Sequence, residues 1–120
     1  MATLTILFMD PPHESATSTT ALRIIDAAIR KGHNVNVMAY EGATATTYLQ
    51  QKTHAKDWIA ALLAAAAARG VKLDWMRSGA DEEERGYHGA QLTGTRSGSP
   101  VEFYKEQVLP ADNVLVIPTR

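Results

Sequence analysis

Four runs of apolar residues recur along the chain, and each has the length of a β-strand. They cover residues 3–9, 33–40, 71–76 and 113–118. The first and last runs are continuously apolar, which is typical of strands buried on both faces of a sheet. In the second run Val35, Val37 and Ala39 alternate with polar or larger residues, so one face is more apolar than the other. The runs therefore predict four strands that differ in how they are buried.

Helical periodicity fills most of the intervening segments. A helix is expected from about Ser15 or Thr17 to Lys31-Gly32, because its apolar residues recur every three or four positions. A longer, alanine-rich helix is expected from about His54 to Arg69, and a short one within residues 43–51. Ser99-Pro100 is a typical helix start, and that helix should end before Pro110. Residues 91–93 fit a short extended piece.

This order of elements, β-α-β-α-β-loop-α-β, predicts an α/β fold. We expect a three-layer open, mostly parallel sheet, flanked by helices and joined by right-handed crossovers, as in flavodoxin-like proteins. With 120 residues and neither repeats nor a linker, the chain is expected to form a single domain over residues 1–120.

Composition narrows the classes of function. The formal net charge of -1 gives no bulk attraction to nucleic acid or to an anionic membrane, so neither is expected as a partner. No apolar run is long enough to span a bilayer and no signal peptide is evident, so a cytoplasmic location is expected. The chain has no cysteine, which excludes disulfides, thiolate metal sites and thiol nucleophiles.

The densest polar segment, residues 77–86, directly follows the third strand. Ligands of open α/β sheets bind beyond the carboxyl ends of the strands, which makes this segment a candidate site. Its candidate residues are Ser78, Gly79, Asp81, Arg85 and Gly86. The segment contains neither His nor Lys to activate Ser78, so no catalytic residue is predicted. The alternative is a solvated turn, in which the acidic residues 81–84 simply begin a helix.

A second candidate is the loop after the first strand, which includes Pro12, His13 and Ser15. Free N–H groups and hydroxyls at the following helix start would suit a phosphate, but the same residue types serve plain helix capping. The loop has no glycine-rich phosphate motif, and the four histidines have no metal-ligand spacing. No cofactor and no metal are therefore predicted.

With these elements placed, the chain resembles the DsrE/DsrF-like family of small sulfur-relay proteins, which includes TusD-like members. The resemblance lies in the order of five short pieces: Lys31-Gly32-His33, Tyr40-Glu41-Gly42, Arg69-Gly70-Val71, Arg85-Gly86 and Ala111 to Leu115. In sulfur-carrying members, one or two cysteines precede the Arg-Gly pair. By the family's spacing these cysteine positions fall on Ser78 and Asp81, and neither side chain can carry a persulfide.

The resemblance implies a non-catalytic subunit of an oligomeric sulfur-relay assembly. The oligomer would be a dimer, trimer or hexamer of this chain, or a hetero-oligomer with cysteine-bearing DsrE/DsrH-like or TusA-like proteins. Ser78, Asp81 and Arg85 would line the family's pocket, with residues 11–15 and Tyr40, Glu41 and Gly42 at its rim. Two alternatives remain open at this stage. One is a small-molecule or nucleotide/anion-binding protein that uses the Ser/Thr-rich first loop, and the other is an enzyme with Asp81 or His13 as base.

Overall fold

The computed structural model describes residues 2–11, 17–51, 54–86 and 91–117, and the structural statements below refer to these ranges. The elements follow in the order β1 (Thr3–Phe8), α1 (Thr17–Arg30), β2 (Asn34–Ala39), the 3-10 segment η1 (Glu41–Thr47), α2 (Ala55–Arg69), β3 (Leu73–Ser78), α3 (Gly79–Glu84), β4 (Thr95–Gly98), α4 (Pro100–Phe103), the π-helical η2 (Tyr104–Val108) and β5 (Asn113–Ile117). Each predicted helix has a counterpart in this order.

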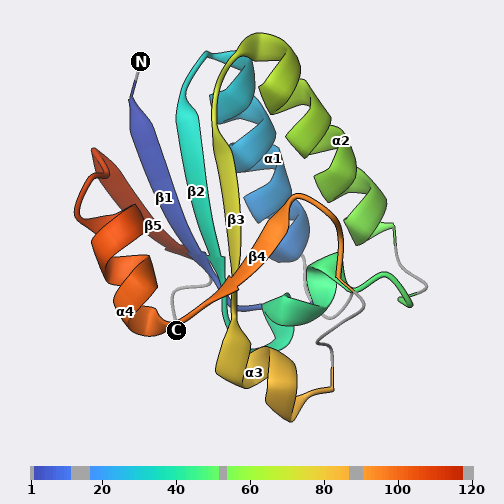
Figure 1. The fold of residues 1–120 in the computed structure, drawn as a ribbon. Helices are drawn as coiled ribbons and strands as arrows, with labels where there is room; N and C mark the ends of the chain where they lie inside the picture. Colours follow the sequence, from blue (N-terminus) through green and yellow to red (C-terminus); the bar gives the residue numbers. More distant parts are fainter. Residues whose placement is uncertain (1, 12–16, 52–53, 87–90, 118–120) are drawn as a thin grey trace.

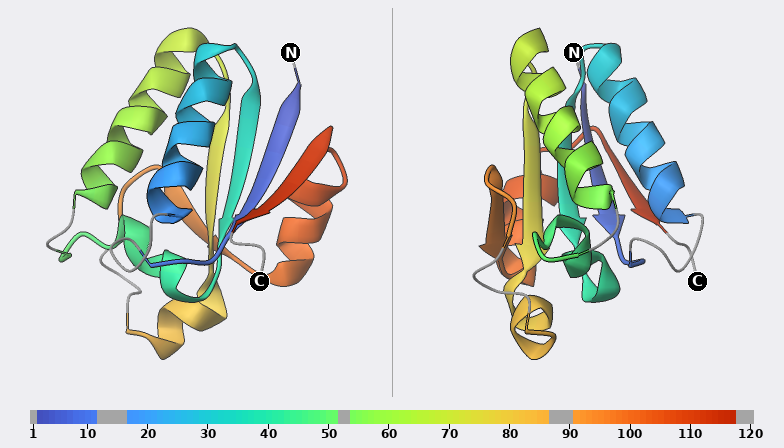
Figure 2. Two further views of the ribbon diagram at one scale, coloured as in Figure 1. Left: turned by 180° about the vertical axis from the view of Figure 1, so that it is seen from behind. Right: turned by 90° about the vertical axis from the view of Figure 1, so that its right-hand side faces the viewer.

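The strands form one five-stranded sheet in the order β4-β3-β2-β1-β5, and all neighbouring strands are parallel. The connections from β1 to β2 and from β2 to β3 step in the same direction across the sheet, so right-handed crossovers place α1 and α2 on the same face. The connection from β4 to β5 returns the other way and places α4 on the opposite face (Figures 1 and 2). This confirms the predicted three-layer α/β fold.

The core lies between the sheet and the pair α1 and α2. Helix α1 buries Leu22, Ile25 and Ile29 at the spacing expected from the sequence, and α2 buries Ile59 and Leu62. On the alanine-rich part of α2, Ala66 is buried while its neighbours at 64, 67 and 68 are exposed. Ala66 therefore contributes to the core, whereas the alanines at 64, 67 and 68 are exposed to solvent.

The end of one strand and the presence of another differ from the sequence prediction. β3 extends to Ser78, so Arg77 and Ser78 belong to the strand and not to the following loop. β4 was missed, because its four residues have no apolar periodicity and pair with β3 through backbone contacts. At Gly98 an added Cβ would lie 2.3 Å from the sulfur of Met76, so only glycine lets β4 approach this buried side chain.

The prediction that the last strand is buried on both faces is wrong. β5 lies at the edge of the sheet, and the side chains of Val114 and Val116 are 47% and 36% exposed. The physical reason is the position of η2. Its buried side chain, Gln107, reaches β1 and β3, where Thr5 donates to its backbone oxygen at 2.5 Å and Asp74 O accepts from its amide at 3.1 Å.

The layer beneath η2 is unusually polar for a sheet face. The amide of Asn36 in β2 donates to Thr5 Oγ1 at 3.2 Å, and Thr5 in turn donates to Gln107. All three residues are buried. Hydrogen bonds between buried groups therefore help to attach η2 to the sheet.

Asp74 links β3 to β4 on the same face, where Arg96 donates to both of its carboxylate oxygens at 2.9 and 2.8 Å. Burial raises the pKa of the Asp74 carboxyl, but hydrogen bonds from Arg96 and Gln107 and the charges of Arg96 and Lys72 outweigh burial, so the pKa lies below its ordinary value. In the unfolded chain the carboxyl binds a proton more readily. The stabilisation is therefore complete above the ordinary pKa of 3.8 and is lost as the pH falls through the lower folded-state pKa.

We predict that Asp74→Asn lowers the free energy of unfolding at neutral pH by about 1–3 kcal/mol, because Arg96 loses a charged acceptor. The difference between the two proteins should shrink below pH 3.8, where the carboxyl of the unfolded wild type takes up a proton while the folded carboxyl, with its lower pKa, is still ionised. Urea unfolding of both proteins between pH 3 and pH 7 measures this difference in the free energy of unfolding. A difference that does not change over this range would show that the carboxylate charge contributes nothing.

Candidate functional site

The candidate site lies at the carboxyl-terminal edge of the sheet, where α3 continues directly from β3 and packs against η1 (Figure 1). The predicted one- to two-turn helix in the acidic segment is present as α3, and Arg85 and Gly86 follow it. Its register is fixed at its start, because Ser78 Oγ accepts from the backbone N–H of Asp81 at 3.5 Å.

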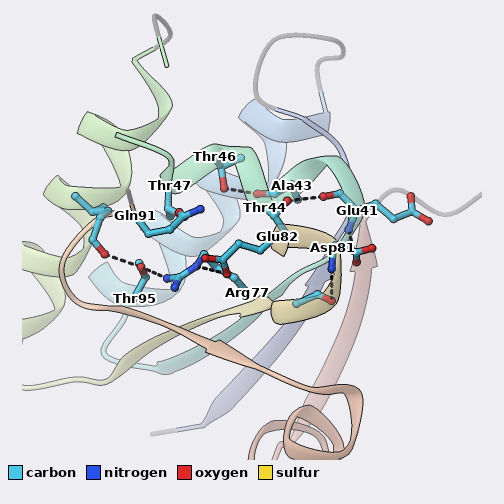
Figure 3. A network of polar contacts seen from close by, with 12 residues as sticks. Glu41, Ala43, Thr44, Thr46, Thr47, Arg77, Asp81, Glu82, Gln91 and Thr95 are labelled. Carbon is cyan, nitrogen blue, oxygen red and sulfur yellow. Dashed lines mark hydrogen bonds and ion pairs between the residues drawn. The ribbon is translucent and has the colours of Figure 1, made fainter. Parts of the chain in front are cut away.

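A buried ion pair lies under this helix. Arg77 Nε donates to Glu82 Oε2 at 3.0 Å, and the two side chains are only 9% and 4% exposed. Arg77 Nη1 also donates to Thr95 Oγ1, whose hydroxyl donates to Leu92 O at 2.6 Å (Figure 3). The arginine thus ties α3 to β4 as well as to β3. The expectation that the acidic run is a solvated helix start is wrong at Glu82, because that carboxylate is the partner of a buried cation.

Asp81 holds the turn that follows β2. Its Oδ2 accepts from the backbone N–H of Glu41 at 2.9 Å. Glu41 has φ of 51°, the left-handed conformation that side chains other than glycine and asparagine rarely adopt. The carboxylate of α3 thereby fixes a strained position of η1, and residues forty positions apart in the sequence meet at the same edge.

Tyr40 and Gly42 flank this strained turn. Burial and then the negative charge of Asp81 raise the pKa of the Tyr40 phenol, so it stays protonated at neutral pH and is a hydrogen-bond donor. At Gly42 an added Cβ would lie 2.9 Å from the ring of Pro11, so glycine allows the chain after β1 to approach η1 closely.

The rest of η1 is held by its own threonines and by the segment before β4. The hydroxyls of Thr44 and Thr46 donate to Glu41 O and Ala43 O at 2.7 and 2.6 Å, and Thr47 donates to the side-chain oxygen of Gln91 at 2.5 Å (Figure 3). These threonines are buried, so this part of the edge is rigid and presents few free hydroxyls.

Six of the predicted site residues lie close to one another at this edge: Ser78, Gly79, Asp81, Tyr40, Glu41 and Gly42. Arg85 and Gly86 are exposed at the end of α3. Pro12, His13 and Ser15 lie outside the described residues, as does the helix start at Ser15. Within the described ranges, no group of three or more acidic or histidine side chains is arranged to hold a metal ion.

Sequence reasoning included Arg77 and Glu82 in the candidate segment without naming them as candidate residues, and it missed Thr95. A signal was available, because Arg77 continues a buried strand and a guanidinium there requires an acceptor. The segment offers one hydroxyl, four carboxylates and two guanidinium groups, but neither an imidazole nor an amine. Such groups suit hydrogen bonding to a polar ligand or to a partner, and they provide no activated nucleophile.

The fold and this edge define an open, all-parallel α/β protein whose polar edge follows the third strand. Comparison with protein families matches residues 2–87 to the family described as DsrE/DsrF-like. The chain belongs to the DsrE/DsrF-like family, and the resemblance inferred from the sequence is confirmed. No match was found among curated proteins.

Solved structures share the fold. The YchN protein from E. coli has a TM-score of 0.79 and 21% identity, over 97% of this chain and 99% of that one. MTH1491 from Methanobacterium thermoautotrophicum, a protein of unknown function, has a TM-score of 0.75 and 9% identity, over 96% and 99% of the two chains. BT1422 from Bacteroides thetaiotaomicron, a conserved protein of unknown function, has a TM-score of 0.65 and 14% identity, over 97% and 95%.

Among the described residues, no helix combines the length and the apolar character that crossing a bilayer requires.

Proposed function

We propose that this chain is a non-catalytic subunit of an oligomeric sulfur-relay or sulfur-metabolism assembly. The observation that carries the proposal is the chemistry at the two positions where sulfur-carrying members of the family have cysteine. Ser78 caps α3, and Asp81 accepts a hydrogen bond from the strained Glu41. Ser78 and Asp81 therefore stabilise the edge of the sheet, in place of the sulfur chemistry that cysteines would perform at these positions.

A persulfide needs a thiolate sulfur, and the chain has no cysteine. Any role in sulfur relay therefore depends on binding a cysteine-bearing protein. The exposed part of the edge, which includes Glu41, Arg85 and Gly86, offers both signs of charge beside the position of the missing thiol. A subunit of this kind would support the persulfide of its partner without taking the sulfur.

Two measurements test the proposal. Mixed with a persulfidated, cysteine-bearing DsrE-like subunit, the wild-type chain should elute in a complex by size-exclusion chromatography with light scattering. Intact-mass spectrometry should find the added sulfur on the partner alone. Ser78→Cys/Asp81→Cys should instead acquire sulfur, with Asp81→Cys more reactive than Ser78→Cys, because Ser78 is buried and Asp81 is partly exposed.

The matched control is Ala64→Cys, which places a thiol on an exposed residue of α2, outside the candidate edge. Sulfur found equally on this control would mean that the edge has no special reactivity. Turnover of a persulfide donor by the wild-type chain, or a chain that stays monomeric alone and with every cysteine-bearing partner, would contradict the proposed function.

A further inference from the structure

Two buried oxygen atoms between the sheet and η2 lack a hydrogen-bond donor. They are Asn36 Oδ1 and Gln107 Oε1, and neither has a hydrogen-bond partner among the described residues. Asn36 is 3% exposed and Gln107 is 0% exposed, so bulk solvent does not solvate these side chains. Because buried polar atoms in folded proteins are nearly always hydrogen-bonded, two acceptors without donors in one layer indicate a further group between them.

The orientation of both side-chain amides follows from the groups around them. Thr5 has one hydroxyl proton and donates it to Gln107 O at 2.5 Å, so the Asn36 atom 3.2 Å from this hydroxyl must be the amide nitrogen. The Gln107 atom 3.1 Å from Asp74 O must also be a nitrogen, because a backbone carbonyl only accepts. Rotating either amide by half a turn would set two acceptors against each other. The unpaired atoms are therefore the two oxygens.

The register of the sheet brings the two oxygens to one place over β2. Thr5, Asn36 and Asp74 are partners on the adjacent strands β1, β2 and β3. Gln107 is tied to Thr5 through its backbone and to Asp74 through its side chain, and neighbouring strands lie about 4.8 Å apart, so this side chain crosses over Asn36. Asn36 turns its oxygen away from Thr5, and Gln107 turns its oxygen away from the carbonyl of Asp74.

We propose that this place is an internal binding site for one neutral hydrogen-bond donor, a water molecule that donates one proton to Asn36 Oδ1 and the other to Gln107 Oε1. Two acceptors cannot pair with each other, and for the same reason they exclude an anion. The carboxylate of Asp74 in this layer already accepts two hydrogen bonds from Arg96, so its charge is balanced and does not attract a cation. Water is the small neutral group with two protons to donate.

The π-helical turn of η2 brings the glutamine to this place. Leu109 N donates to Tyr104 O at 3.0 Å, a bond that spans five residues where an α-helix spans four. Within this wider turn Gln107 is buried against the sheet, while Tyr104 and Leu109 are exposed. Turns of this kind are rare and frequently accompany functional sites. The bridging water links the turn to β2, the central strand of the sheet, on the face opposite α1 and α2 (Figure 2).

The test counts long-lived internal water molecules by oxygen-17 magnetic relaxation dispersion in the wild type and in Gln107→Met. The variant keeps a side chain of similar length and removes one of the two acceptors, so it should hold one long-lived water fewer. Gln50→Met is the matched control, because Gln50 is an exposed glutamine, and its count should equal that of the wild type. Equal counts in the wild type and in Gln107→Met would overturn the inference.

A second readout uses the wild type alone and does not depend on the folding of a variant. A high-resolution crystal structure should show one peak of electron density within about 3.2 Å of both Asn36 Oδ1 and Gln107 Oε1. Direct hydrogen bonds from protein donors to both oxygens, or no density between them, would refute the water site. The proposed function rests on Ser78 and Asp81, so neither outcome bears on it.

Discussion

Glu82→Ala is expected to lower the free energy of unfolding by about 3–5 kcal/mol, because it leaves the buried guanidinium of Arg77 without a counter-charge. The side chain of Arg77 is 9% exposed, so water cannot readily replace the lost carboxylate. Thr95 remains as an acceptor, but a neutral hydroxyl compensates little of the charge. Equilibrium urea unfolding followed by circular dichroism measures the change.

Glu83→Ala is the matched control, since the neighbouring carboxylate is exposed in the same helix, and its effect should stay within about 0.5 kcal/mol. Removing both charges by Arg77→Met/Glu82→Leu should recover much of the lost stability, because no buried charge is then left unpaired. Equal effects of Glu82→Ala and Glu83→Ala would contradict the buried pair.

Trp75→Ala is expected to cost about 3–5 kcal/mol, the range for truncating a fully buried large aromatic side chain. Trp75 is 0% exposed and meets Phe8 edge to face, with ring centroids 6.4 Å apart and an interplanar angle of 83°. It precedes Arg77 on the same face of β3, so the cavity would lie directly before the residue that anchors α3.

Trp75→Phe is the informative companion, because it keeps an aromatic ring against Phe8 and removes an indole N–H that has no hydrogen-bond partner within the described residues. We expect a clearly smaller loss for this variant, since the deleted polar group was unsatisfied. Thermal and urea unfolding of the two variants, with near-ultraviolet circular dichroism as a check on packing, measure the difference. A phenylalanine variant as unstable as the alanine variant would show that the indole N–H is solvated or bonded.

The strands that could be predicted from the sequence are those whose apolar residues face the core. Val35, Val37 and the core of α1 follow this pattern, because burial requires apolar side chains at fixed spacing. β4 could not be predicted in this way. It has four residues, pairs with one neighbour and is attached through Arg96 and Thr95, whose side chains carry no periodic signal.

The location of the candidate site was predictable, but its contacts were not. The position of the segment after the third strand follows from the order of the elements along the chain, and the family's spacing selects Ser78 and Asp81 within it. Four consecutive acidic residues look alike in the sequence, however. Only the register of α3, set by its N-cap Ser78, turns Glu82 toward Arg77 and Asp81 toward Glu41. The burial of β5 was mispredicted for a related reason. An apolar run shows that a strand can be buried, but it does not show which element packs on it.

The hydrogen bond between Asp81 and Glu41 couples the residue types that the two positions can hold. A left-handed φ costs a residue other than glycine about 1–2 kcal/mol, and the carboxylate of Asp81 offsets part of that cost. A chain with a thiol in place of the carboxylate at position 81 would lose the acceptor that steadies position 41. Glycine at 41 is the change that would relieve the turn. Placing a thiol at position 81 without destabilising the turn therefore takes two substitutions forty residues apart, in η1 and in α3.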